Sequence, residues 1–302
     1  MKNGFVALVG RPNAGKSTLL NRLVGEKLAI VSDKPQTTRN RITGVRNYPE
    51  GQVIFVDTPG VHRPIHRLNV RMVDAAVQAL GEVDVVVAVV DASEPPGGGD
   101  RYVMDLVRQA KVPRVLALNK VDVVEKPALL PVIERYDRTV GFADIVPVSA
   151  LTGDNIERLE SVVLSHLPEG DRLYPDDYLT DQPERFFVAE LVREQVLQHT
   201  RAELPFASAV VVDRFEEPDA NGLLRLFCTI LVERESQKPI VVGKGGAMIK
   251  AIGTAARAEL ERFFDARVFL DLRVKVRADW REDDRMLDEL GVHSIRRKHR
   301  KR

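Results

Sequence analysis

A glycine-rich stretch near the start of the chain has the residue types and spacing that bind phosphate. Residues 10–18 match the pattern G-x-x-x-x-G-K-[ST] between an apolar run, residues 5–9, and a helix-like segment, residues 19–24. Glycines let backbone N–H groups turn toward phosphate oxygens, and a helix N-terminus adds partial positive charge. We expect Lys16 to bridge the β- and γ-phosphates of a nucleotide and the Ser17 hydroxyl to bind Mg²⁺. The expected nucleotide contacts are Gly10, Arg11, Pro12, Asn13, Ala14, Gly15, Lys16, Ser17 and Thr18.

A second motif, Asp57-Thr58-Pro59-Gly60, follows the strand-like residues 52–56. Because ligands bind at the carboxyl ends of strands in open α/β sheets, we expect this motif to lie beside the glycine-rich stretch. Asp57 is expected to hold Mg²⁺ through water, and the N–H of Gly60 can approach a γ-phosphate because no Cβ intervenes. Proline and glycine alone would indicate only a turn, but the position after a strand favours a nucleotide site.

Two later segments indicate that the nucleotide carries guanine. The strand-like residues 114–118 end in Asn119-Lys120-Val121-Asp122. The Asp122 carboxylate can accept paired hydrogen bonds from the N1–H and the exocyclic amine of guanine. Adenine lacks this pair of donors, so binding adenine would leave the carboxylate unpaired at a cost on the order of a few kcal/mol. We expect the Lys120 stem to lie along the base and the backbone of Ser149-Ala150-Leu151 to contact the base oxygen. In this order the motifs are specific to GTPases.

The elements that must position these motifs are predicted as buried strands and covering helices. Apolar, β-branched runs at residues 83–90 and 114–118 are typical of strands buried on both faces of a parallel sheet. Residues 103–110 and 155–167 are predicted as helices, residues 32–39 as a polar, mobile loop, and residues 95–99 as a loop. The first 167 residues therefore predict an α/β P-loop GTPase domain, a mostly parallel sheet with helices on both faces.

The second half of the chain has a different order of elements. Residues 170–177 are polar and contain proline, which suits a linker. We predict a helix at residues 184–200, strands at 207–215 and 223–233, a helical apolar segment that includes residues 240–242, a helix from 247 to 264, and a strand at 268–276. This order around Gly243-Lys244-Gly245-Gly246 matches an α+β type II KH domain. The predicted domains are residues 1–170, a linker at 171–183, residues 184–280, and a C-terminal extension at 281–302.

The G-x-x-G loop of such a domain approaches the backbone of single-stranded nucleic acid so closely that side chains would obstruct it. Lys244 can contact a phosphate, and Ile252 is expected to line an apolar groove for the bases together with its neighbours. Trp280 follows the last predicted strand, where an interior anchor is favoured over a stacking platform. The expected RNA contacts are Val242, Gly243, Lys244, Gly245, Gly246, Ile249 and Lys250.

Composition narrows the class of protein. The formal net charge of +1 does not by itself indicate a polyanion partner, whereas residues 296–302, with six basic residues and no acidic one, do. That tail is either a solvated terminus or an additional contact with RNA. The single cysteine, Cys228, lies in an apolar run and is interpreted as a core residue in a reducing compartment. No apolar stretch approaches the roughly 20 residues of a membrane span, so a cytoplasmic protein is expected. We also expect it to be a monomer.

A G domain followed by a KH domain resembles the Era family of bacterial ribosome-assembly GTPases. The resemblance is carried by residues 10–18, Pro35-Gln36-Thr37-Thr38-Arg39, residues 57–60, residues 119–122 and residues 242–246. It implies GTP and GDP with Mg²⁺ as ligands. It also implies binding to the 3′ end of small-subunit ribosomal RNA, and hence to the small ribosomal subunit, with the nucleotide gating RNA affinity. Thr38 is then the expected Mg²⁺ ligand in the GTP state, and Thr37 is the competing choice.

The resemblance extends to catalysis. Signalling GTPases place a glutamine after the Asp-x-x-Gly motif, whereas this chain has Val61, and the family is similar in lacking that glutamine. We expect slow intrinsic hydrolysis with Lys16, Thr38, Gly60 and Asn13 contributing, and with Asn13 supporting a K⁺ ion as in related GTPases. Two alternatives stay open at this point: an RNA-binding scaffold with negligible hydrolysis, and a membrane-surface protein whose basic tail binds anionic lipid.

Overall fold

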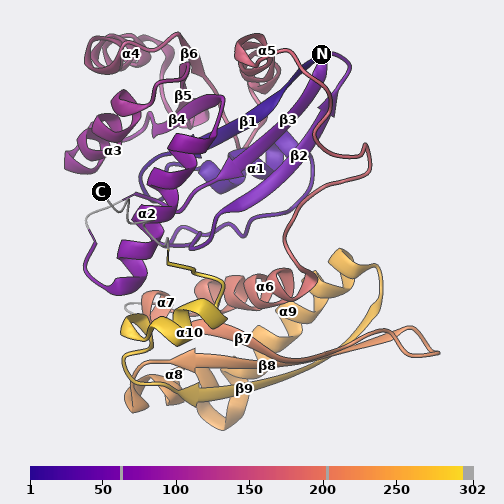
Figure 1. Ribbon diagram of the computed structural model, residues 1–302. Helices are drawn as coiled ribbons and strands as arrows, with labels where there is room; N and C mark the ends of the chain where they lie inside the picture. The colour runs from indigo at the N-terminus through magenta and orange to yellow at the C-terminus, as the bar shows by residue number, and fades with distance from the viewer. Residues whose placement is uncertain (62–63, 202–203, 295–302) are drawn as a thin grey trace, which may run out of the picture.

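The computed structural model describes residues 1–61, 64–201 and 204–294, which form two packed units joined by an extended segment (Figure 1). The first unit, indigo to magenta, is built on a six-stranded sheet, and the second, pink to yellow, on a three-stranded sheet. The basic tail at residues 296–302 lies outside the described residues. No helix in the described ranges is both long and apolar enough to cross a membrane.

The six strands of the first unit are β1 (Lys2–Val9), β2 (Ile42–Tyr48), β3 (Gly51–Asp57), β4 (Val85–Asp91), β5 (Arg114–Asn119) and β6 (Asp144–Pro147). Their order is β2-β3-β1-β4-β5-β6, and every neighbouring pair is parallel except β2 with β3. The chain adds β3 on one side of β1 and β4 on the other. The carboxyl end of β1 therefore lies at the switch point where ligands bind in such sheets.

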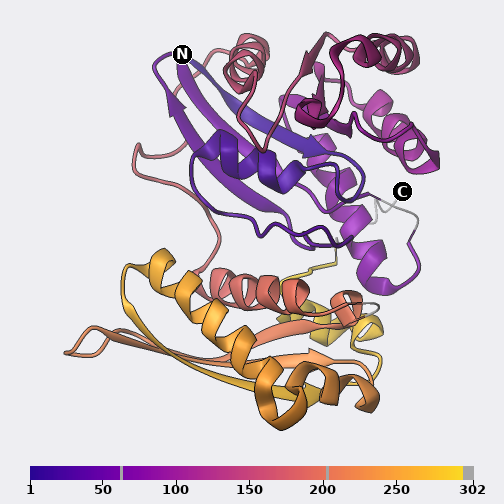
Figure 2. The same cartoon turned by 180° about the vertical axis from the view of Figure 1, so that it is seen from behind.

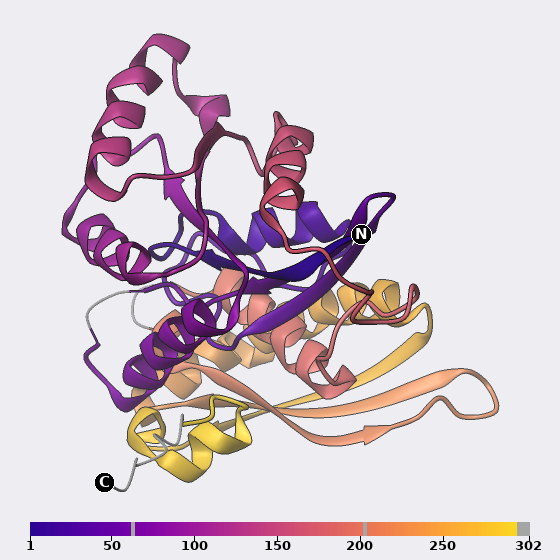
Figure 3. The ribbon, with the colours of Figure 1, turned by 45° about the horizontal axis from the view of Figure 1, so that its top comes forward.

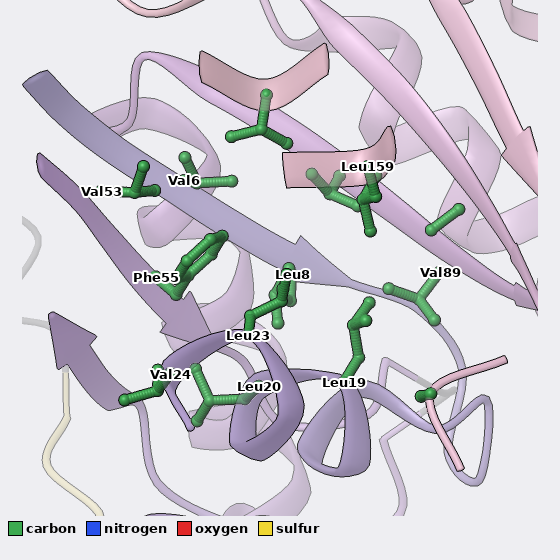
Figure 4. Packing of buried hydrophobic residues seen from close by; sticks show 14 of the residues in the cluster. Val6, Leu8, Leu19, Leu20, Leu23, Val24, Val53, Phe55, Val89 and Leu159 are labelled. Carbon is green, nitrogen blue, oxygen red and sulfur yellow. The ribbon is translucent and has the colours of Figure 1, made fainter. Parts of the chain in front are cut away.

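In the part of the chain that the structure describes, five α-helices cover this sheet: α1 (Lys16–Val24), α2 (Arg67–Glu82), α3 (Gly98–Gln109), α4 (Lys126–Val140) and α5 (Ile156–His166). Helices α1 and α5 bury their apolar residues on one face, and α2, α3 and α4 bury theirs on the other. Figure 4 shows Leu19, Leu20 and Leu23 of α1 against Leu8 and Phe55 of the central strands. This apolar packing fixes the carboxyl ends of the strands, where the predicted motifs lie.

The predicted helix at residues 103–110 was wrong at its start, since α3 begins five residues earlier. Gly97 precedes the helix, and its N–H donates to Oδ2 of Asp100 at 2.8 Å, which caps the first turn. The glycines at 98 and 99 thus belong to the helix, and the loop predicted at 95–99 is shorter. Helices α2 and α4 were not predicted.

The second unit contains α6 (Glu184–His199), α7 (Leu204–Ala207), β7 (Ala209–Glu216), β8 (Leu223–Val232), α8 (Lys238–Val242), α9 (Ala247–Phe264), β9 (Arg267–Val276) and α10 (Asp284–Glu289). The β7 and β8 strands are antiparallel, and β8 and β9 are parallel. Helices α6 and α9 pack side by side on one face of this sheet (Figure 2). The predicted α–β–β–α–α–β order is confirmed, although Ala207 ends a short helix instead of starting the first strand.

The linker and Trp280 are among the contacts that hold the units together. The linker runs beside β2, where Val45 N donates to Leu179 O at 2.8 Å and Thr180 Oγ1 donates to Thr43 O at 2.7 Å. Trp280 is fully buried beside Leu68 of α2, and its indole N–H donates to Ala207 O at 3.0 Å. The interior position predicted for Trp280 is therefore confirmed. Figure 3 shows the opposite end of this unit, where the β7–β8 hairpin extends beyond the helices.

Candidate nucleotide site and nucleic-acid interface

The loop between β1 and α1 can be built only with glycine at its key positions. Gly15 has a φ of +91°, and a Cβ there would lie 2.2 Å from Nδ2 of Asn119. A Cβ on Gly10 would lie 2.4 Å from Val89 O. The loop thus fits closely against the ends of β4 and β5 and leads into the N-terminus of α1, a geometry that binds phosphate.

Lys16 is the buried cation of this loop. Its Nζ donates to Arg11 O at 2.8 Å, and burial lowers its pKa to about 8 while Asp57 acts in the opposite direction. A lysine bonded to one loop carbonyl keeps two further N–H donors for phosphate oxygens. The structure therefore places the Lys16 ammonium inside the loop, and its contact with phosphate stays a prediction.

Three oxygen-bearing side chains converge at the start of α1. Ser17 Oγ lies 2.7 Å from Oδ2 of Asp57 and 2.6 Å from Oγ1 of Thr38. Burial raises the pKa of Asp57 to about 6, and its Oδ1 has no hydrogen-bond partner among the described residues. Hydroxyl and carboxylate oxygens are the ligands that Mg²⁺ prefers. An orphaned buried carboxylate oxygen beside two hydroxyls fits this ion.

The two adjacent threonines have different surroundings. Thr37 Oγ1 donates to Lys34 O at 2.6 Å within its own loop, whereas Thr38 Oγ1 points to Ser17 and lies 3.5 Å from Oδ2 of Asp57. Of the two alternatives left open by the sequence, this arrangement favours Thr38 as the metal ligand. Asn13 also reaches this loop, since its Nδ2 donates to Asp33 O at 2.7 Å.

The segment after β3 packs directly against the phosphate loop. A Cβ on Gly60 would lie 2.8 Å from the backbone of Pro12, and Val61 N donates to Gly10 O at 3.2 Å. The Val61 side chain is fully buried. Gly60 is therefore held beside the phosphate loop, and the side chain of Val61 offers a water molecule no hydrogen bond.

The predicted base-binding residues lie together beyond the phosphate loop. Asn119 joins the segments, because its Nδ2 donates to Ala14 O at 2.9 Å and its Oδ1 accepts from Ala150 N at 2.9 Å. Asp122 is exposed, so its carboxylate can meet a base. Thr58 lies elsewhere, at the end of β3, where its Oγ1 donates to Leu8 O of β1 at 2.8 Å.

Sequence reasoning missed one residue of this region. Lys120 Nζ lies 2.5 Å from Oδ2 of Asp91, which is buried at the end of β4 and also accepts from Ser93. This ion pair fixes the lysine stem that is expected beside the base. The signal was available, since Asp91 ends a buried parallel strand at the ligand edge of the sheet.

The G-x-x-G loop is a second constrained backbone segment. Gly243, Gly245 and Gly246 have φ values of +75°, +60° and +81°, and a Cβ on Gly243 would lie 2.7 Å from Met248 N. Leaving aside the adjoining residues of the loop, no heavy atom in the described part of the chain lies within 4 Å of a Cβ built on Gly245 or Gly246, so the backbone is open on that side. The flanking residues are the half-buried Val242 and Ile249 and the exposed Lys244 and Lys250.

One groove residue was predicted wrongly. Ile252 is fully buried and belongs to the core between α9 and the small sheet, so it does not line an open groove. Ile249 lies one turn earlier on nearly the same face of α9 and is only half-buried, at the edge of the core that covers Ile252 completely.

Comparison with known proteins adds to this geometry. A family model described as "50S ribosome-binding GTPase" matches residues 5–120, and a KH domain model matches residues 203–281. GTPase Era from Geobacter metallireducens is 52% identical over 290 residues, covering 96% of this chain and 97% of that protein. The chain belongs to the Era family of GTPases. GTPase Era from Heliobacterium modesticaldum is 46% identical over 291 residues, again covering 96% and 97%.

A solved Era structure agrees with the whole architecture. The crystal structure of a single-residue variant of Aquifex aeolicus Era bound to GDP·AlF4⁻ is 41% identical, with a TM-score of 0.93 over 97% of this chain and 100% of that one. Both the mostly parallel P-loop domain and the KH domain are thus features of Era, and the chain is a GTPase.

Proposed function

We propose that this GTPase binds small-subunit ribosomal RNA near its 3′ end and assists maturation of the small ribosomal subunit. The observation that carries the proposal is a crystal structure of Era in complex with MgGDPNP and nucleotides 1506–1542 of 16S ribosomal RNA. That protein is 41% identical to this chain, with a TM-score of 0.94 over 97% of this chain and 99% of that one. The open G-x-x-G backbone described above supports the same role.

In the proposed nucleotide site, Ser17, Thr38 and Asp57 hold Mg²⁺. When bound, this ion neutralises charge on the β- and γ-phosphate oxygens. Lys16 and the loop N–H groups hold the phosphates, and Asp122 selects guanine. The backbone N–H of Gly60 contacts the γ-phosphate. Because the Val61 side chain cannot hydrogen-bond to the attacking water, backbone groups position that water. Asn13 supports a K⁺ ion in this proposal, and hydrolysis without a partner is slow.

We propose four segments: the G domain (residues 1–170), the linker (171–183), the KH domain (184–280) and the C-terminal extension (281–302). Asn3 N donates to Pro168 O at 3.0 Å, which ties the end of the first segment to β1. Helix α6 begins at Glu184, which agrees with the end of the linker.

The RNA site is proposed at the G-x-x-G loop. Lys244 and Lys250 contribute phosphate contacts, and the apolar groups of Val242 and Ile249 contact bases. The open faces of Gly245 and Gly246 leave room for a nucleic-acid backbone. Loss of both lysines should reduce RNA affinity. It should also reduce the steepness of the plot of log K against log salt concentration by up to about two.

The experiment measures binding of fluorescent RNA, with the sequence of 16S nucleotides 1506–1542, by the full chain with GDP and with GDPNP. We expect tighter binding with GDPNP and weaker binding by the Lys244→Ala/Lys250→Ala variant. Lys111→Ala, at an exposed lysine in the G domain, is the control. Equal binding by the double variant and the unmodified chain would refute the proposed RNA site.

A further inference from the structure

The loop that carries Thr38 is held from both sides. We define the threonine loop as residues 31–40, between α1 and β2. Its inner side places Thr38 Oγ1 2.6 Å from Ser17 Oγ at the proposed metal site. Its outer side lies against α6 and α7 of the KH domain, so the KH domain contacts the part of the G domain that must be ordered for GTP.

Arg193 of α6 makes the central contact. Its side chain is 3% exposed, and one of its Nη2 hydrogen bonds goes to the carbonyl oxygen of Thr37. Glu190 fixes the guanidinium from the other side, with 2.7 Å from Nε to Oε1 and 2.6 Å from Nη2 to Oε2. A planar guanidinium held by a carboxylate in two places has little freedom to turn away. The position of the Thr37 carbonyl, and of the next residue, is therefore set from the KH domain.

The entrance of the threonine loop is fixed by the next residue of the same helix. Val31 N donates to Oε1 of Glu194 at 2.9 Å, and Lys27 Nζ lies 2.7 Å from its Oε2. Glu194 is 2% exposed, so its charge is buried, while the Lys27 side chain that reaches it is 40% exposed. A buried carboxylate that receives both a backbone N–H and an ammonium is a strong anchor.

The exit of the threonine loop is fixed at Arg39. Its guanidinium donates to Ser208 O at 2.8 Å and to Pro205 O at 3.1 Å, and its Cζ lies 5.4 Å from the centre of the Trp280 ring. Arg39 immediately follows Thr38 in the chain. The residue on each side of Thr38 is thus bonded to the KH domain.

We propose that the KH domain completes the GTPase site, with Arg193 as a positioning residue that holds the threonine loop so that Thr38 stays at the metal site. This inference rests on the proposed assignment of Thr38. Arg193 touches neither the nucleotide nor the metal in this arrangement; it acts through the backbone of Thr37. Because coupling between sites is reciprocal, a nucleotide that orders Thr38 also favours the docked position of the KH domain.

The test compares GTP and GDP with the full chain. GDP lacks the γ-phosphate that the threonine loop encloses, so Arg193→Ala should leave GDP affinity within about twofold of the unmodified value. The same variant should bind GDPNP more weakly and hydrolyse GTP about ten- to hundredfold more slowly, the usual cost of a small misplacement at a catalytic site. Arg193→Lys should recover part of the loss, because it restores the charge but not the planar donor pair.

Arg185→Ala is the matched control. Arg185 is an exposed arginine on the same helix, and its contacts are with Val212 O and the Phe215 ring, neither of which belongs to the threonine loop. Glu194→Gln is a second variant, which keeps the side-chain shape. It too should weaken GDPNP binding while leaving GDP affinity nearly unchanged. If Arg193→Ala lowers folding stability, Arg193→Lys and Glu194→Gln carry the test.

Two results would overturn the inference: unchanged hydrolysis and GDPNP affinity in these variants, or an equal loss of GDP and GDPNP affinity. A different result would contradict the proposed function. If the unmodified chain binds no RNA, the proposed RNA role is wrong, whereas the GDP–GDPNP comparison of the Arg193 variants stands without RNA.

Discussion

Ser17 Oγ, in the first turn of α1, lies 2.6 Å from Oγ1 of Thr38, in a loop that enters the site from the other direction. Oδ2 of Asp57 lies 2.7 Å from Ser17 Oγ and 3.5 Å from Thr38 Oγ1. Three segments of the G domain thus bring hard oxygen ligands to one point. The arrangement agrees with a site in which metal, γ-phosphate and loop order depend on each other.

The two neighbouring threonines give a matched pair of variants. Thr38→Ala should weaken Mg·GDPNP binding about tenfold, the effect of losing one charge-assisted contact, and leave GDP binding unchanged. Thr37→Ala removes only the local bond to Lys34 O and should change GDPNP binding less than about threefold. Titrations with fluorescent nucleotides measure both. A larger effect at Thr37 than at Thr38 would reverse the assignment of the metal ligand.

Asp122 should determine which base is accepted. In Asp122→Asn the amide can accept from N1–H but presents an N–H where guanine has its amine, so GDP affinity should fall about a hundredfold. Xanthosine diphosphate carries a carbonyl at that position and should bind more tightly to the variant than GDP does. Competition binding gives both constants. Glu125→Gln, at a nearby exposed carboxylate, is the control and should alter neither.

Trp280 should contribute to folding stability and not to RNA affinity. Trp280→Ala removes a fully buried ring and should lower the free energy of unfolding by about 3–5 kcal/mol. Trp280→Phe keeps most of the packing but loses the hydrogen bond to Ala207 O, at a cost of about 1–2 kcal/mol. Urea unfolding followed by circular dichroism measures the difference. Unchanged stability together with weaker RNA binding would restore the stacking role.

Cys228 should be unreactive in the folded chain. Burial, with Asp213 and Asp271 nearby, raises the pKa of its thiol from 9.0 to about 12. The folded state therefore keeps a proton that the unfolded state releases between about pH 9 and 12, and the contribution of Cys228 to stability falls as pH rises above about 9. At pH 8 a disulfide reagent should label the native protein at least about a hundredfold more slowly than the unfolded protein. Similar rates in both states would contradict the buried position.

The sequence predicted that the nucleotide motifs would lie together, because each motif is local. Each motif combines a strand end with residues whose chemistry is visible in one short segment, as in residues 10–18 and 57–60. Parallel strands bring such segments to one edge, so their meeting followed from the fold class. Asp91 was missed because its role depends on Lys120, which follows the next strand.

The contacts between the domains could not be predicted in the same way. Arg193 and Glu194 lie on α6, where the sequence predicted a helix but assigned no role to these two charged side chains. Their partners, Thr37 and Val31, are 156 and 163 residues away in the sequence. Ile252 shows the opposite error, because its place near the glycines suggested the surface although the helix turns it into the core.

The linker has a consequence for solubility. β2 lies at the end of the large sheet, and a strand in that position presents unpaired backbone groups on which another chain can grow. The bonds from Val45 N to Leu179 O and from Thr180 Oγ1 to Thr43 O occupy part of this row, and Asn47 Nδ2 adds a bond to Asp176 O at 2.8 Å. The segment that joins the domains thus also shields the sheet from edge-to-edge aggregation, and cutting or lengthening it would expose that strand even if both domains stayed folded.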